Sequence, residues 1–89
     1  MLREEIQISN QLGLHARASA KLTQLASNYA CEVWMEKAAR RVNAKSIMGV
    51  MMLAAGRGST VMVETDGHDE KEAMEALLAL IRDKFGEEN

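Results

Sequence analysis

The spacing of apolar residues switches along this chain between a period of two and a period near 3.6, and this switching limits the possible folds. Alternation over residues 2–9, 31–36 and 60–65 predicts half-buried strands. Spacings of three and four over residues 16–28 and 69–85 predict amphipathic helices. The chain is therefore expected to form a sheet that buries one face under helices.

The remaining segments complete the predicted order strand, helix, strand, strand, helix, strand, helix. Residues 10–13 and 66–67 carry turn chemistry, residues 40–43 pair as a third strand, and residues 47–53 form a short helix that ends near Gly56. Asp69 is expected to cap the last helix in a capping box with Glu72, and Phe85 to end its buried stripe.

This order predicts the fold class of an α/β (α+β) two-layer, open-faced sandwich. Three helices would cover one face of a four-stranded, mostly antiparallel sheet. A ferredoxin-like domain with an additional helix has the same order of elements, so the order alone does not determine function.

Size and composition exclude several classes of protein. The 89 residues form a single domain, 1–89. A net charge of −2 and three aromatic residues provide neither a basic surface nor a stacking platform for nucleic acid. One cysteine fits a reducing cytoplasm, and no apolar run is long enough for membrane insertion. Two histidines and one cysteine make no metal-ligand set, and we expect no cofactor.

His15 lies where the turn at residues 10–13 becomes the first predicted helix. The backbone N–H groups of Ala16, Arg17 and Ala18 are free in that first turn. Their positive end favours a neutral, nucleophilic imidazole and would stabilise a phosphoryl group on the ring. The Arg17 guanidinium can also bind phosphate oxygens in a forked contact. A histidine at a helix start is often only a cap, and the spacing does not separate these roles.

The predicted helix at residues 47–53 is rich in methionine and follows Ser46, which is expected to be its N-cap. A helix on a sheet buries one stripe only, which suits Val50 and Leu53, with Met51 at its margin. An apolar patch with a basic rim would suit acidic partners. We expect this docking patch to comprise Arg17, Ala20, Lys21, Lys45, Ile47, Met48, Met51 and Met52.

Two segments resemble a known family. Gly-Leu-His-Ala-Arg at residues 13–17 resembles the phosphorylation site of HPr, the histidine phosphocarrier of the bacterial phosphoenolpyruvate-dependent phosphotransferase system. Asn-Ala-Lys-Ser-Ile-Met-Gly-Val at residues 43–50 resembles the HPr segment that carries a regulatory serine. The family commonly has proline where this chain has Ala18, and alanine restores a backbone N–H near the phosphate.

The resemblance implies a carrier, not an enzyme. His15 would take a phosphoryl group from phosphorylated enzyme I and pass it to an enzyme IIA component in sugar uptake or regulation, and Arg17 would stabilise the phosphate. Ser46 would be a regulatory site for HPr kinase/phosphorylase. Transient docking of two partners favours a cytoplasmic monomer.

Two alternatives remain open in the sequence. A nitrogen-related regulatory phosphocarrier of the same family would use the same site with different partners. A ferredoxin-like module that binds a ligand or RNA would need a basic or aromatic sheet face, whereas Trp34 is expected to share that face with Glu32, Glu36 and Glu64. No second titratable group of a suitable type lies near His15 in sequence, and residues 87–89 are expected to fray.

Overall fold

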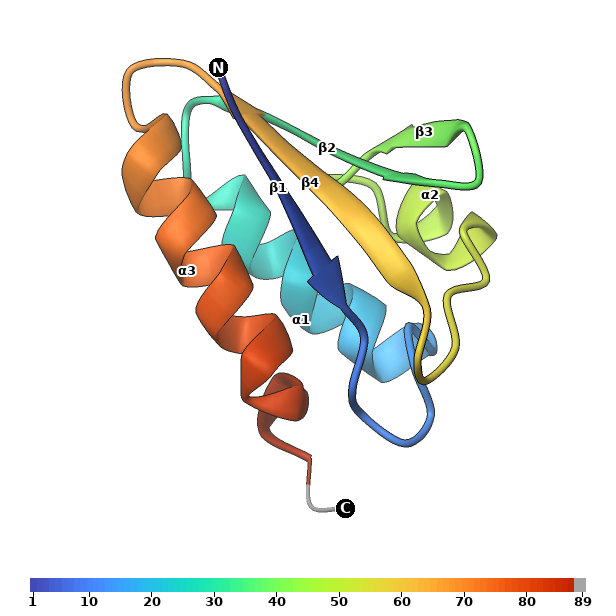
Figure 1. The fold of residues 1–89 in the computed structure, drawn as a ribbon. Coiled ribbons are helices and arrows are strands. Elements are labelled where there is room, and N and C mark those ends of the chain that lie inside the picture. The colour runs from blue at the N-terminus through green and yellow to red at the C-terminus, as the bar shows by residue number, and fades with distance from the viewer. Residues whose placement is uncertain (88–89) are drawn as a thin grey trace.

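The computed structural model describes residues 1–87 and confirms the predicted order of elements. One face of the sheet is covered by helices and the other face is open (Figure 1). Within the described residues, no helix is both long and apolar enough to cross a membrane. The elements are β1 (Leu2–Gln7), α1 (Ala16–Ser27), β2 (Glu32–Lys37), β3 (Arg40–Asn43), α2 (Ile47–Met52), β4 (Thr60–Asp66), α3 (Glu70–Arg82) and the 3-10 helix η1 (Lys84–Gly86).

The sheet has the order β1-β4-β2-β3, and every pairing is antiparallel. β1 lies at one edge and pairs with β4 alone. A ferredoxin-like, split β-α-β sheet is also antiparallel, but it places β3 between β1 and β2, where this sheet has β4. The strand pairing therefore separates this fold from the ferredoxin-like alternative that shares its order of elements.

The core lies between the sheet and its helices, as the alternating pattern predicts. Val33 and Met35 of β2, together with Val61 and Val63 of β4, are each 1% exposed. Full burial of an aliphatic side chain of this size contributes about 1.5–3 kcal/mol to folding. Facing them are the buried stripes of the two long helices: Ala18, Leu22 and Ala26 of α1, and Ala73, Met74, Leu77, Leu78 and Ile81 of α3.

The open face carries a network of charges around Glu64, which is only 7% exposed. Nε of Arg41 lies 3.2 Å from a Glu64 carboxylate oxygen, and the Arg41 guanidinium lies 4.3 Å from the centroid of the Trp34 ring. Arg3 is a second cationic neighbour of Glu64, at 4.0 Å. Trp34 thus lies on the open face as predicted, and it shares this face with the acidic side chains of Glu32, Glu36 and Glu64.

The capping box predicted at the start of the last helix is wrong. Asp69 precedes α3 but makes no side-chain cap hydrogen bond there. Its two carboxylate oxygens accept the backbone N–H groups of Ala30 and Cys31, at 2.8 and 2.9 Å. The residue therefore joins the start of α3 to the segment between α1 and β2. A contact between segments 38 residues apart leaves no local pattern in the sequence.

The last helix is also shorter than predicted, because α3 ends at Arg82. Lys84 and Phe85 have φ angles of 55° and 57°, a left-handed conformation that is rare for bulky side chains. Phe85 is nonetheless 1% exposed, so it belongs to the core as expected but enters it from η1. Burial of the ring offsets the backbone strain and turns the chain toward the start of α1.

The β2–β3 turn offers a test of backbone strain. Ala38 and Ala39 have φ angles of 51° and 69°, which cost alanine about 1–2 kcal/mol each. The double substitution Ala38→Asn, Ala39→Gly supplies the residues that such turns prefer. We expect the free energy of unfolding in urea to rise by about 1 kcal/mol, after the extra chain entropy of glycine is subtracted. The control Ala79→Gly, at an exposed position of α3, should lower the free energy of unfolding by about 1 kcal/mol. If the free energy of unfolding fell in both variants, the backbone at Ala38 and Ala39 would not be strained.

The Asp69 contacts predict a pH dependence of stability. Hydrogen bonding, first from Ala30 N–H, lowers the pKa of Asp69 below its ordinary value. A lowered pKa stabilises the folded state above the ordinary value of about 4, and this stabilisation is lost as the pH falls through the lowered pKa. We expect wild type to exceed Asp69→Asn in free energy of unfolding near neutral pH, and the difference to shrink in acid. The control Glu72→Gln changes the exposed second residue of the predicted capping box. It should differ less from wild type in free energy of unfolding than Asp69→Asn does.

Candidate functional site

The loop before α1 is fixed by a close backbone contact. Gly13 has a φ of +65°, and a Cβ at this position would lie 2.4 Å from the carbonyl oxygen of Ala55 and 2.7 Å from Cα of Gly56. The next residue, Leu14, donates its N–H to Ala55 O at 2.9 Å. Only glycine fits this approach, which joins the loop to the segment after α2.

His15 is the N-cap of α1. Its backbone is extended, with φ −74° and ψ −179°, and its carbonyl accepts the N–H of Ser19 at 2.8 Å. Its side chain turns toward the helix, where Nδ1 accepts the backbone N–H of Arg17 at 3.2 Å. A backbone N–H can only donate, so Nδ1 presents a lone pair and carries no proton in this arrangement.

Glu87 lies against the other side of the imidazole, with its carboxylate Oε2 2.6 Å from Nε2 of His15. Its second carboxylate oxygen accepts Nδ2 of Asn10 at 3.1 Å. These hydrogen bonds, the one from Asn10 first, lower the pKa of Glu87 below its usual range. The prediction of a frayed end is therefore wrong at Glu87, while Glu88 and Asn89 lie outside the described residues.

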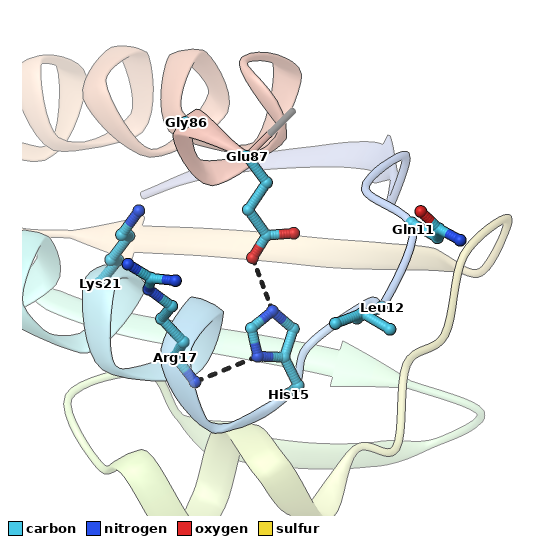
Figure 2. Close-up of a pocket in the computed structure, with 7 residues that line it drawn as sticks. All are labelled: Gln11, Leu12, His15, Arg17, Lys21, Gly86 and Glu87. Carbon is cyan, nitrogen blue, oxygen red and sulfur yellow. Dashed lines mark hydrogen bonds and ion pairs between the residues drawn. The ribbon is translucent and has the colours of Figure 1, made fainter. Parts of the chain in front are cut away.

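The ring lies in an open hollow of about 380 Å³, whose lining is drawn in Figure 2. Arg17 and Lys21 lie on one side of the imidazole and Leu12 on the other, with Glu87 across from the ring. Nζ of Lys21 also donates to the carbonyl of Phe85 at 2.6 Å, which ties α1 to the C-terminal segment. An unprotonated ring nitrogen between a helix start and two cations is suited to binding an anionic group.

Ser46 is the N-cap of α2, as predicted. Its backbone is extended, and its Oγ accepts the N–H of Gly49 at 3.1 Å. The residue is half-buried beside the exposed side of the short helix.

The exposed side of α2 agrees with the predicted apolar patch. Val50 and Leu53 are buried, whereas the exposed fractions of Met48 and Met52 are 71% and 57%. Met51 is 38% exposed and Ile47 43%, so both lie on the outer side of the helix. The contact of Gly13 and Leu14 with Ala55 brings this patch beside the His15 loop.

The predicted basic rim is divided. Lys21 lines the hollow with His15 and Arg17, and Ala20 is half-buried on the same helix. Nζ of Lys45 instead donates to the carbonyl of Tyr29 at 2.7 Å, past the C-terminal end of α1. Because His15 caps the opposite end of α1, Lys45 does not belong to the hollow. In the sequence each lysine lies near one of the two motifs. In the fold, Lys21 lies near His15, whereas Lys45 lies past the C-terminal end of α1.

Sequence reasoning missed five residues around the ring: Asn10, Gln11, Leu12, Gly86 and Glu87. In the sequence the first three carry only turn chemistry, although Leu12 is 69% exposed in the lining, and Glu87 contacts a histidine 72 residues away. The available signal in the sequence is Phe85, an apolar residue whose burial holds the nearby Glu87 close to the core. Among residues 1–87, no group of three or more His, Cys, Asp or Glu side chains is arranged to hold a metal ion.

The family is shown by comparison with known proteins. A family model described as "PTS HPr component phosphorylation site" matches residues 2–83. The chain belongs to the HPr family. It is an HPr-type phosphocarrier of the phosphotransferase system. Ala18, where the resemblance implies a proline, is buried in a regular first turn of α1.

Relatives match this HPr chain from end to end. It is 68% identical over 87 residues to the phosphocarrier protein HPr of Cupriavidus necator, with 98% of each chain covered. The crystal structure of HPr-C-His from Thermoanaerobacter tengcongensis matches at a TM-score of 0.97, with 47% identity and 100% of both chains covered. A crystal structure of an HPr dimer from the same organism matches at 0.79, with 47% identity and 98% and 100% covered. The monomer expected for this chain therefore stays a prediction.

Proposed function

We propose that this chain accepts a phosphoryl group on Nδ1 of His15 from phosphorylated enzyme I and donates it to an enzyme IIA component. It acts in the cytoplasm as a monomer between these two partners. The observation that carries the proposal is the hydrogen bond from Arg17 N–H to Nδ1, which leaves this nitrogen unprotonated at the start of a helix.

The transfer step follows from the two ring nitrogens. The Nδ1 lone pair attacks phosphorus, the bond between phosphorus and the donor nitrogen breaks, and that electron pair returns to the donor. Passing the group onward repeats the step with His15 as the donor. The proton on Nε2 remains in place beside Glu87, 2.6 Å away, so no separate base is needed on the carrier.

The surroundings of the ring support a bound phosphate. Attachment of the phosphoryl group at Nδ1 releases the Arg17 N–H from its hydrogen bond to that nitrogen. The phosphoryl oxygens then lie toward the N–H groups of Ala16, Arg17 and Ala18, which have no partner within the helix in its first turn. The side chains of Arg17 and Lys21 add positive charge on one side of the same hollow. Positioning and charge of this kind supply most of the catalysis in phosphoryl transfer.

The exposed side of α2 is the docking face in this proposal. Met48 and Met52 are flexible apolar side chains that fit different partner surfaces, and the nearby Arg17 favours acidic ones. Ser46 stands at the edge of this face, at the start of α2. Its phosphorylation by HPr kinase/phosphorylase would add about two negative charges there and repel an acidic partner.

Substitution of His15 tests the acceptor. His15→Asn keeps an N-capping side chain, and His15→Ala removes it at a cost of about 1 kcal/mol in stability. Both should lose the acid-labile mass gain produced by phosphoenolpyruvate, magnesium and enzyme I. The matched control His68→Ala, which changes the chain's other, exposed histidine, should gain the phosphoryl group at the wild-type rate. Equal labelling of His15→Ala would overturn the proposal.

Substitution of Ser46 tests the docking face. Ser46→Asp retains a good N-cap and adds one negative charge, while Ser46→Asn retains the cap without the charge. We expect Ser46→Asp to lower kcat/KM for phosphorylation by enzyme I about tenfold, and Ser46→Asn to change it less than twofold. Equal kinetics for wild type and Ser46→Asp would remove Ser46 from the docking face. A separate assay distinguishes the sugar-uptake carrier from the nitrogen-related carrier. It measures transfer of the phosphoryl group from labelled wild type to purified IIA proteins of each kind.

A further inference from the structure

The carboxylate of Glu87 lies where it can control the proton on the far side of the His15 ring. Nδ1 accepts a backbone N–H, so the ring hydrogen belongs to Nε2, which faces Glu87 Oε2 at 2.6 Å. The two side chains are 25% and 17% exposed, so the pair is partly shielded from water. A carboxylate behind an imidazole commonly fixes its tautomer and stabilises its protonated form.

Several contacts hold Glu87 in this position. Asn10 is fully buried, and its Nδ2 binds both the Glu87 carboxylate at 3.1 Å and the carbonyl of Gly13 at 2.8 Å. Phe85 anchors the segment in the core, and Lys21 binds its carbonyl. An ion pair on the surface is usually weak and mobile. Here the buried side chains of Phe85 and Asn10 both hold the segment, so Glu87 keeps a defined position beside the ring.

Phosphorylation changes what this contact does. With a phosphoryl group on Nδ1 and a proton on Nε2 the ring is a cation. When the N–P bond breaks, its electron pair returns to Nδ1 and a neutral imidazole leaves. Without the Nε2 proton the leaving group would be an imidazolate anion, which is expelled far more slowly. The charged side chains that line the hollow are Arg17 and Lys21, which disfavour the ring cation, and Glu87, which favours it.

We propose that Glu87 is a positioning residue that keeps Nε2 of phosphorylated His15 protonated and thereby keeps the phosphoryl group transferable at neutral pH. The inference rests on the proposed function, because it concerns the same phosphohistidine. It predicts that the charge of residue 87, and not only its ability to accept a hydrogen bond, determines how fast the N–P bond breaks.

Three substitutions separate charge from shape. Glu87→Gln keeps an acceptor for Nε2–H but removes the charge, Glu87→Ala removes both, and Glu87→Asp keeps the charge on a shorter side chain. Glu75→Gln, an exposed position on α3, is the matched control. Each protein also carries His68→Ala, which leaves His15 as its one histidine, and is phosphorylated with enzyme I and, separately, with phosphoramidate. Hydrolysis of the phosphohistidine is then followed by ³¹P NMR across the neutral pH range.

In Glu87→Gln and Glu87→Ala the pH profile of hydrolysis should move about one unit toward acid, which makes hydrolysis up to about tenfold slower where the profiles diverge. Glu87→Asp should restore part of this shift, and Glu75→Gln should match wild type. In the unphosphorylated proteins, ¹⁵N NMR should detect mainly the Nε2–H tautomer in wild type and Glu87→Gln, and a mixture in Glu87→Ala.

Superimposed hydrolysis profiles for wild type and Glu87→Gln would overturn the inference. This result differs from failure of the proposed function, in which enzyme I leaves wild type unlabelled. The phosphoramidate-labelled proteins still report on Glu87 in that case, since phosphoramidate modifies histidine without a protein partner.

Discussion

The close contact of Gly13 with the backbone of Ala55 and Gly56 is the constraint on which the site depends. A Cβ at Gly13 would lie 2.4 Å from Ala55 O, so no other residue allows this approach. The contact fixes the loop that ends in His15 and joins it to the segment after α2. The His15 ring and the exposed apolar side chains of α2 are therefore held beside each other.

The imidazole is held from two directions that are distant in sequence. Arg17 N–H binds Nδ1 from the start of α1, and Glu87 binds Nε2 from the C-terminal segment. Nδ1 is thereby kept as a hydrogen-bond acceptor and Nε2 as a donor, although the free ring can exchange these roles. Local and distant contacts thus act on different atoms of the same ring.

The open sheet face and the helical layer differ in the side chains that they expose. Glu64 and Arg41 pair across the strands and Trp34 packs under Arg41, so the charges of this face are largely paired with one another. The exposed apolar side chains of α2 lie on the helical layer instead. One layer therefore pairs its charges within the domain, while the edge of the other layer exposes the apolar side chains on which the proposed docking face depends.

The sequence by itself determined the order of the elements, the covered face of the sheet, the N-cap role of Ser46 and the exposed methionines. These features depend on spacings of two, three or four residues, which the backbone geometry converts directly into burial. Only the tertiary structure decided that Asp69 binds the segment before β2, that Lys45 lies away from the hollow and that Glu87 reaches His15. Each of these contacts depends on how whole elements pack and where the chain turns at Lys84 and Phe85, and no local pattern records it.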